Sequence, residues 1–181
     1  MSSGDKELLE LLDRSGAELY ALLTRLTLRE DVAEELMQDL FIKLSNSRGG
    51  AKITNLDAYA RRAAMNLAFD WRRARSRRAG IGLGQIAEPV AGGASPLSTL
   101  INSEEMQETL NAIGRLKKAS REALVMRYIQ QESYDDIARQ MGKTSHQVRA
   151  MCSRSIGKLR DMLGSNHRQS AAKEIKNVQN R

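Results

Sequence analysis

Side chains that can read the edges of DNA bases are concentrated between residues 145 and 158. Arginine pairs with guanine through two hydrogen bonds, an amide side chain pairs with adenine, and serine binds phosphate. Free backbone N–H groups at a helix start also favour a phosphate. The residues predicted to contact DNA here are Ser145, His146, Gln147, Arg149, Ala150, Ser153, Arg154 and Lys158. An ordinary helical hairpin with a basic surface is the alternative, because a turn between two helices is only moderately specific.

Two predicted helices would position these side chains. Ser133 is a suitable N-cap, Gly142 a suitable helix end, and the apolar stripe between them is Tyr134, Ile137, Ala138 and Met141. After the turn, a longer helix has an inward stripe formed by Val148, Cys152, Ile156, Leu159 and Leu163. The segment from Ser133 to Leu163 therefore predicts a helix-turn-helix that binds DNA.

A second basic region lies earlier in the chain, between residues 61 and 78. It has a single acid, Asp70, against seven arginines: Arg61, Arg62, Arg72, Arg73, Arg75, Arg77 and Arg78. Together with Tyr59, Phe69 and Trp71, this stripe is suited to holding phosphates and stacking on exposed bases. The alternative is that Phe69 and Trp71 are core residues and the arginines a solvated helix end.

Acidic residues gather at the start of the preceding helix, with no lysine or arginine among them: Glu30, Asp31, Glu34, Glu35 and Asp39. Such a surface repels DNA, so in a DNA-binding protein it would face away from the duplex and suit a basic protein partner. A solvated acidic helix face without a partner is the alternative.

The chain is predicted to be all-α, with two small helical domains joined by a linker. Both prolines and several glycines fall within residues 79–103, which lack a helical period. The domains span residues 6–78 and 104–163, and residues 164–181 form a polar tail that we expect to be frayed. In the first helix, the pair Ser15–Gly16 is expected to split or bend the leucine stripe that runs from Leu8 to Leu26.

The remaining composition narrows the function. A net charge of +7 over 181 residues favours an anionic partner. One cysteine and two histidines do not make a disulfide or a Cys/His zinc site, so no metal or other cofactor is expected. No nucleophile, base and orienting group can be assembled, so the chain is predicted not to be an enzyme. No signal peptide or apolar span is recognisable, so we expect a cytoplasmic protein without membrane insertion.

The order of three sequence blocks resembles a known family. The blocks are the acidic REDVAEELMQDLFIKL, the basic LDAYARRAAMNLAFDWRRARSRR, and, after the linker, SYDDIARQMG with the helix that follows it. Together they are similar to the two-domain extracytoplasmic-function (group 4) RNA polymerase sigma factors, over most of Leu8 to Leu163. The resemblance implies a protein that binds core polymerase and directs promoter recognition and transcription initiation.

The resemblance also implies roles for individual residues. Binding to the clamp helices of the largest polymerase subunit falls to Asp31, Glu34, Glu35, Gln38, Asp39 and Phe41, and the flap region of the polymerase is a further contact. The loop from Gly49 to Asn55 and the helix after it would bind the minus-10 element, through Asn55, Arg61, Arg62, Asn66, Trp71, Arg72, Arg73 and Arg75. The last helix would read the minus-35 element. An anti-sigma factor is a possible further partner.

Two features depart from the family pattern. The turn GKTSHQVRAMCSRS replaces the more usual Gly-Thr-Val step, so the minus-35 preference is left open at His146 and Gln147. The tail beyond Leu163 lies outside the minimal pattern. The main rival reading is a helix-turn-helix regulator that does not bind core polymerase, and a helical adaptor would explain only the acidic helix.

Overall fold

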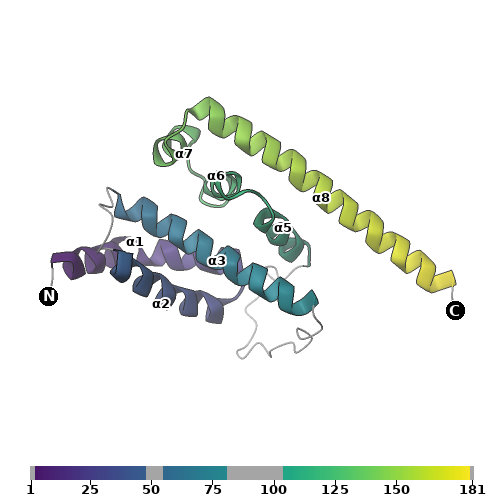
Figure 1. The fold of residues 1–181 in the computed structure, drawn as a ribbon, viewed down its shortest axis with the longest axis horizontal. Coiled ribbons are helices and arrows are strands. Elements are labelled where there is room, and N and C mark those ends of the chain that lie inside the picture. Colours follow the sequence, from purple (N-terminus) through teal and green to yellow (C-terminus); the bar gives the residue numbers. More distant parts are fainter. Residues whose placement is uncertain (1–2, 48–54, 81–103, 180–181) are drawn as a thin grey trace. The chain divides into compact units, whose positions relative to one another are not determined.

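The computed structural model describes residues 3–47, 55–80 and 104–179, and all its regular elements are helices (Figure 1). The chain divides into two compact units, residues 1–103 and 104–181. The prediction of an all-α chain with two small helical domains is confirmed within the described residues, which form three helices in the first unit and four in the second. Residues 81–103, most of the predicted linker, and residues 49–54 of the predicted minus-10 loop lie outside them.

The first unit is a three-helix bundle of α1 (Ser3–Thr27), α2 (Glu30–Asn46) and α3 (Leu56–Gly80), each packed against the other two. The buried residues of α2 include Ala33, Leu36, Leu40 and Leu44, whereas Met37 is half-buried. The largest fully buried side chains of this unit are Leu11, Leu19, Leu23, Leu26, Leu40, Leu44, Met65 and Phe69. Each of the three helices contributes apolar side chains to this core, and their burial is the main force that holds the bundle together.

Helix α1 is continuous through Ser15 and Gly16, so the predicted split at this pair does not occur. Ser15 is buried, and its hydroxyl donates to Oδ1 of Asp57 on α3 at 2.8 Å. A partner on the neighbouring helix satisfies the hydroxyl, so it does not compete for the backbone of α1. Ser15 therefore connects α1 to α3 at the position where we expected α1 to be split or bent.

The turn between α1 and α2 is tight. Leu28 has a positive φ of 60° and its N–H donates to the carbonyl of Thr24 at 2.8 Å, which ends α1 with a left-handed residue. Leucine is an unusual residue for this conformation. Its side chain is buried, and this burial offsets the backbone strain.

The second unit consists of α5 (Glu104–Gly114), α6 (Lys118–Tyr128), α7 (Tyr134–Met141) and α8 (Ser145–Gln179). Helices α5, α6 and α7 pack against α8. The buried core includes Leu110, Ile113, Val125, Met126, Ile137, Val148 and Cys152. Met106, on the same helix as Leu110, is exposed. Ile156, Leu159 and Leu163, expected inward on α8, are half-buried.

Helix α8 is longer than predicted. It continues to Gln179, past Leu163, where we expected the helix to end and the tail to fray (Figure 1). Gly164 does not terminate it, although a glycine inside a helix costs about 1 kcal/mol relative to alanine. The backbone of the tail is therefore an extension of the same helix.

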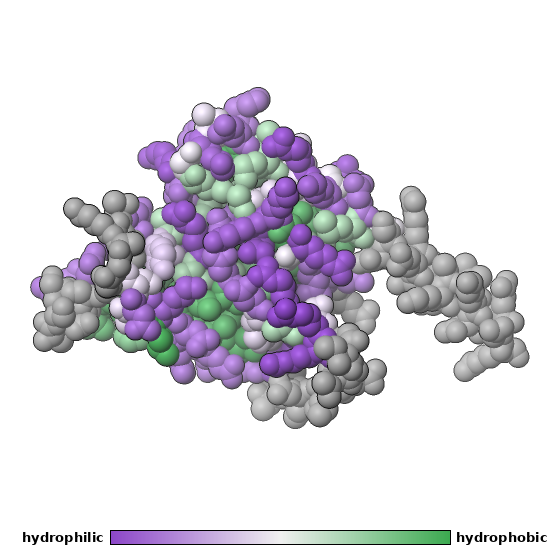
Figure 2. All heavy atoms as spheres, in the orientation of Figure 1, coloured by the Kyte–Doolittle hydropathy of each residue, from purple (hydrophilic) through white to green (hydrophobic). Residues whose placement is uncertain are grey.

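The surface in view is mainly hydrophilic, with hydrophobic side chains visible between the charged ones (Figure 2). Among the described residues, no helix is both long enough and apolar enough to cross a membrane. The described residues also contain no group of three or more histidine, cysteine or acidic side chains arranged to hold a metal ion.

Candidate nucleic-acid interfaces

The helix-turn-helix forms as the sequence predicts. The hydroxyl oxygen of Ser133 accepts a hydrogen bond from the N–H of Asp136 at 3.1 Å and so caps α7. Gly142 follows the last residue of α7 with φ 62° and ψ 40°, the left-handed conformation that glycine adopts without strain. The N–H of Lys143 then donates to the carbonyl of Ala138 at 2.9 Å. These contacts fix the direction in which the chain leaves α7.

The start of α8 is held by a reciprocal cap. The hydroxyl oxygen of Thr144 accepts from the N–H of Gln147 at 3.2 Å, and Oε1 of Gln147 accepts from the N–H of Thr144 at 3.0 Å. This is a capping box, in which two otherwise unpaired backbone donors are satisfied. In addition, the Ser145 hydroxyl donates to Asp135 at the start of α7. The first turn of α8 is therefore rigidly placed relative to α7.

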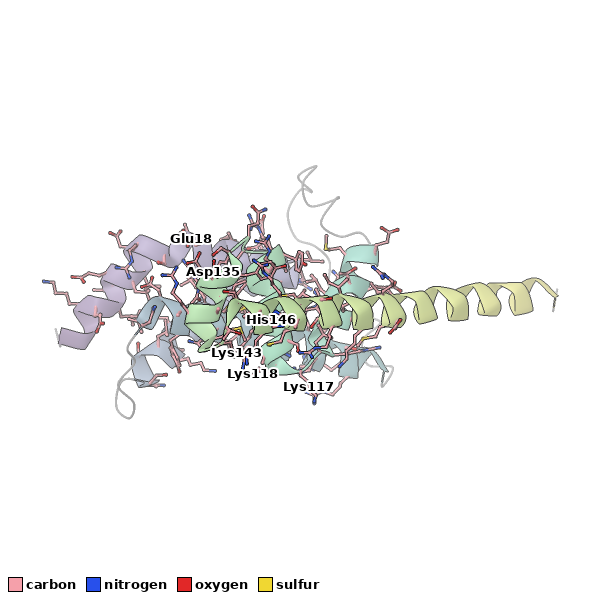
Figure 3. All side chains as sticks on the ribbon, turned by 90° about the horizontal axis from the view of Figure 1, so that it is seen from above. Glu18, Lys117, Lys118, Asp135, Lys143 and His146 are labelled. Atoms are coloured by element: carbon pink, nitrogen blue, oxygen red, sulfur yellow. The ribbon has the colours of Figure 1, made fainter. Side chains whose placement is uncertain are left out.

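The outward face of α8 carries most of the predicted minus-35 residues. His146 lies in its first turn, Lys143 lies in the turn between α7 and α8, and Asp135 lies in the first turn of α7 (Figure 3). Ser145 and Ala150 are half-buried, whereas the exposed members of the predicted set are His146, Gln147, Arg149, Ser153, Arg154 and Lys158. The opposite face is inward, with Val148 and Cys152 fully buried. The arrangement presents polar and basic groups at the helix start, where a recognition helix contacts bases.

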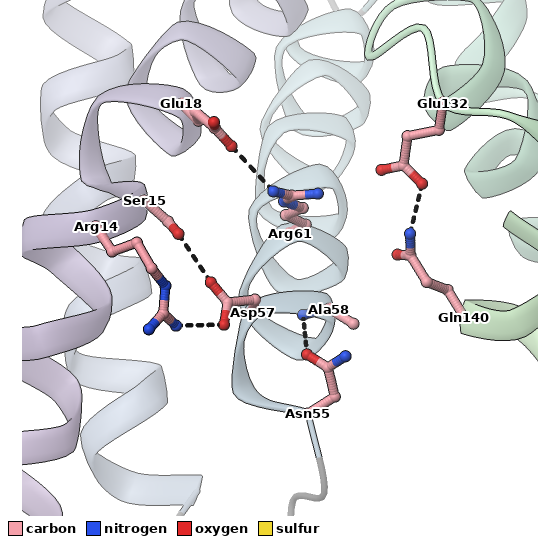
Figure 4. Close-up of polar contacts among 9 residues, drawn as sticks. All are labelled: Arg14, Ser15, Glu18, Asn55, Asp57, Ala58, Arg61, Glu132 and Gln140. Carbon is pink, nitrogen blue, oxygen red and sulfur yellow. Dashed lines mark hydrogen bonds and ion pairs between the residues drawn. The ribbon is translucent and has the colours of Figure 1, made fainter. Parts of the chain in front are cut away.

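The first half of α3 is fixed to α1 by polar contacts (Figure 4). Oδ1 of Asn55 accepts from the N–H of Ala58 at 2.9 Å and so caps the start of α3. Asp57 accepts from Ser15 and, at 2.5 Å, from Arg14. One turn further along, Arg61 forms an ion pair with Glu18 at 2.9 Å. These contacts set the position of the residues that follow on α3.

Asp57 gives these contacts a pH dependence. Partial burial would raise the pKa of Asp57, but the hydrogen bonds from Ser15 and Arg14 outweigh burial and hold it below its usual value. Because the folded-state pKa lies below the unfolded value of about 4, the stabilisation is present above that pH. It is lost as the pH falls through the folded-state pKa.

We therefore expect Asp57→Asn to lower the free energy of unfolding at pH 7 by about 0.5–1 kcal/mol, a modest value because the pair is partly exposed. At pH 3 the difference between the variant and the wild type should shrink. Urea unfolding followed by the fluorescence of Trp71, the single tryptophan of the chain, measures both values. Asp13→Asn, at an exposed position of α1, is the control, and an equal loss at both pH values would contradict the assignment.

The rest of the predicted minus-10 residues do not share one environment. Arg62 and Asn66 are half-buried, and Nε of Arg62 donates to the carbonyl of Ala58 at 3.3 Å. Arg73 is exposed and pairs with Asp70. Arg75 is exposed, with its guanidinium carbon 5.5 Å from the ring centre of Trp71, which is itself half-buried. An indole ring with a stacked cation is a surface on which an unstacked base can lie.

Two members of the basic stripe face inward. Phe69 is fully buried, so the alternative that made it a core residue is correct. Arg72 is also buried, and its Nη1 donates to the carbonyls of Leu26 at 3.2 Å and Thr27 at 3.5 Å. The guanidinium therefore binds the carboxyl end of α1, where a cation is favoured. In this structure Arg72 joins α3 to the α1–α2 turn and does not present its charge to DNA.

Burial also acts on the charge of Arg72. It lowers the pKa of the Arg72 guanidinium to about 10, and the nearby charge of Arg75 contributes to the decrease. The group is still protonated at neutral pH, because this pKa lies about three units above it. The fold thus holds a buried cation whose partners are backbone carbonyl groups.

The outward face of α2 is acidic. The predicted polymerase-binding residues are all exposed: Asp31, Glu34, Glu35, Gln38, Asp39 and Phe41. Asp31 pairs with Arg29, whose hydrogen bond lowers the pKa of the carboxyl group. Glu34, Glu35 and Asp39 have no ion-pair partner among the described residues. Phe41 and Ile42 are exposed beside them, at 41% and 56%.

Two residues of these surfaces were not predicted from the sequence. Ile42 is absent from the predicted set, although it lies off the buried stripe of Leu36, Leu40 and Leu44, and that spacing was the available signal. Tyr134 was assigned to the core, but it is half-buried and contacts Arg149 on the recognition face. Helical spacing could not have predicted the contact between Tyr134 and Arg149, since the two residues lie on different helices.

Comparison with known proteins agrees with this architecture. The family model for sigma-70 region 2 matches residues 11–78, and that for sigma-70 region 4 matches residues 106–159. No curated protein matches the chain by sequence.

Two solved structures share the fold of the chain. The sigma factor RpoE of Bartonella quintana, solved with the anti-sigma factor NepR, is 24% identical with a TM-score of 0.51. That match covers 88% of this chain and 98% of RpoE. CnrH, solved with the cytosolic domain of CnrY, is 18% identical with a TM-score of 0.52. That match covers 90% of this chain and 91% of CnrH.

Both region models match in the order expected for one protein, and together they account for most of the chain outside residues 79–105 and the C-terminal extension. The first covers the bundle with the acidic helix α2, and the second covers the helix-turn-helix. The chain therefore belongs to the sigma-70 family of RNA polymerase sigma factors.

Proposed function

We propose that this sigma factor is of the extracytoplasmic-function (group 4) type and that its three surfaces divide the work of initiation. Residues 6–78 bind the polymerase clamp and the minus-10 element, and residues 104–163 bind the minus-35 element and contact the flap region. The protein acts in the cytoplasm, where a bacterial sigma factor finds polymerase and DNA, and it performs no catalysis itself. The exposed, polar and basic face at the start of α8 is the observation that carries the proposal.

The outer face of α2 is the proposed clamp contact. Its carboxylates at Glu34, Glu35 and Asp39 are exposed and available to a basic partner. Phe41 and Ile42 add apolar area beside them, and an apolar centre with a charged rim is the usual composition of a protein interface. Such a face suits a protein partner better than DNA, since its charge repels phosphate.

The proposed minus-10 contact uses the exposed part of α3. Arg73 and Arg75 offer charge to the phosphates, and Trp71 offers an aromatic ring to an unstacked base. Asn55, Arg61, Arg62 and Asn66 lie nearer the start of the helix. Arg72 is excluded from this set, because its guanidinium is bound to the end of α1.

The proposed minus-35 contact uses Arg149, Ser153, Arg154 and Lys158 on α8, with His146 at the helix start. Two linked DNA-binding units raise each other's effective concentration once one of them is bound. An anti-sigma factor is a further proposed partner, because both similar structures are complexes: RpoE with the anti-sigma factor NepR, and CnrH with the cytosolic domain of CnrY.

Run-off transcription tests the proposal. The purified chain is mixed with core polymerase and fragmented genomic DNA, and transcript start sites are mapped. We expect new start sites that share an upstream and a downstream element, and promoter affinity that falls steeply with salt. The control is core polymerase without the chain. Failure of core polymerase to retain the chain at low salt would instead favour a regulator that acts without polymerase.

A further inference from the structure

The ring of Tyr134 lies against two guanidinium groups. The guanidinium carbon of Arg127 is 4.6 Å from the ring centre and that of Arg149 is 5.1 Å from it. Arg127 is in the last turn of α6, Tyr134 is the first residue of α7, and Arg149 is on the outward face of α8. The side chain of Tyr134 on α7 therefore contacts one residue of α6 and one residue of α8.

The position of this ring is set independently of Arg149. The neighbouring Ser133 caps α7 and so fixes the backbone at Tyr134. Nη1 of Arg127 donates to the carbonyl of Glu132 at 2.9 Å, which holds that guanidinium against the ring. The ring is thus a fixed surface to which Arg149 is added.

Contact with the ring leaves the N–H groups of the Arg149 guanidinium available to DNA. A guanidinium that lies on a ring face keeps its N–H groups at the edge, where they can donate to O6 and N7 of guanine. Arg149 is exposed and has no carboxylate partner among the described residues. A free arginine side chain loses rotamer entropy when it binds, and a side chain already held on a ring loses less.

We propose that Tyr134 is a positioning residue for promoter reading, which orients Arg149 toward one base pair of the minus-35 element without touching DNA itself. The proposal rests on the proposed function, because it requires that α8 binds that element. It predicts that loss of the ring weakens discrimination at the base pair read by Arg149 and at no other position.

The test uses the full chain assembled with core polymerase, on a promoter duplex mapped by run-off transcription. Each base pair of the minus-35 element is substituted in turn, and dissociation constants are measured for four proteins: the wild type, Tyr134→Leu, Tyr134→Phe and Arg149→Ala. We expect Arg149→Ala to reduce discrimination at one base pair by about 5- to 100-fold. Tyr134→Leu should reduce it at the same base pair by about two- to fivefold.

Tyr134→Phe is the matched control, because it keeps the ring and removes only the hydroxyl group. We expect it to keep the discrimination of the wild type. In the double variant Tyr134→Leu with Arg149→Ala, the leucine should add nothing further. Arg149→Lys keeps the charge but loses the planar group, so it should show part of the loss of discrimination that is expected for Arg149→Ala. This variant tests the proposal even if Tyr134→Leu does not fold fully.

A uniform loss of affinity over all base pairs with Tyr134→Leu would overturn the proposal, as would a further loss in the double variant. Unchanged discrimination with Arg149→Lys would overturn it too. Failure of the proposed function has a different signature: the wild type itself would show no discrimination at any upstream base pair, or no binding to core polymerase. The two failures are therefore distinguishable.

Discussion

Charge reversal on the outer face of α2 should abolish transcription while DNA binding by the isolated chain persists. In the triple variant Glu34→Lys, Glu35→Lys and Asp39→Lys, three exposed carboxylates become ammonium groups. Like charges brought together at an interface cost several kcal/mol, and each 1.4 kcal/mol is a factor of ten in affinity. We therefore expect the affinity for core polymerase to fall by about 100-fold or more, measured by pull-down and by titration.

A second triple variant controls for the change in net charge. Glu7, Glu10 and Asp13 are exposed acids of α1 in the same unit, and their replacement by lysine changes the charge by the same amount. We expect this variant to bind core polymerase as the wild type does. If both variants weaken binding equally, the outer face of α2 is not the docking surface.

Replacement of Arg72 should destabilise the first unit more than replacement of any other arginine in the basic stripe. Arg72→Ala removes a buried guanidinium and leaves the carbonyls of Leu26 and Thr27 without these donors at the end of α1. Hydrogen bonds to charged groups contribute about 1.5–3 kcal/mol, and a cavity adds to the loss. We expect the free energy of unfolding to fall by about 2–4 kcal/mol, measured by urea titration of Trp71 fluorescence.

Arg77→Ala is the matched control, because Arg77 is an exposed arginine on the same helix. It should change the free energy of unfolding by less than about 0.5 kcal/mol and weaken DNA binding. The two variants thus separate stability from DNA affinity. An unchanged unfolding midpoint for Arg72→Ala would show that its contacts to α1 do not stabilise the fold.

Helical periodicity predicts the helices and most, but not all, of their buried residues. The stripe of α2, the cap at Ser133 and the left-handed Gly142 all follow from local rules on spacing and capping. These features depend on residues within one or two turns of each other, so a single sequence contains the information. The order of the acidic, basic and helix-turn-helix blocks then indicated the family.

The errors came from contacts between segments that are distant in sequence. Local rules predict that Ser15 splits or bends α1, because they do not include its hydrogen-bond partner Asp57, which lies 42 residues away in the sequence. Arg72 was read as a DNA contact because it stands among arginines, although its spacing from Met65 and Phe69 places all three on the inward face of α3. For Arg72, helical periodicity predicts the position of the side chain better than its residue type does.

The length of α8 was missed for a different reason. Gly164 and the polar residues after it are typical of a helix end, but local propensity is a weak guide where a long helix is already formed. Propagation of a helix costs less than its nucleation. The sequence alone therefore did not distinguish a frayed tail from an extended helix.

Gln147 stands where an amide would ordinarily read adenine, a pairing that uses its oxygen as acceptor and its nitrogen as donor at once. Its oxygen is already bound to the N–H of Thr144. To recognise adenine while it caps the helix, the oxygen would have to accept a second hydrogen bond in the orientation that the cap sets, and otherwise it would have to leave that N–H. Under the proposed function, Arg149 would bind guanine with the first turn of the helix intact. The cap formed by Gln147 would then favour a G·C pair at this end of the promoter site, so a residue that stabilises the helix would also limit the bases that the helix can recognise.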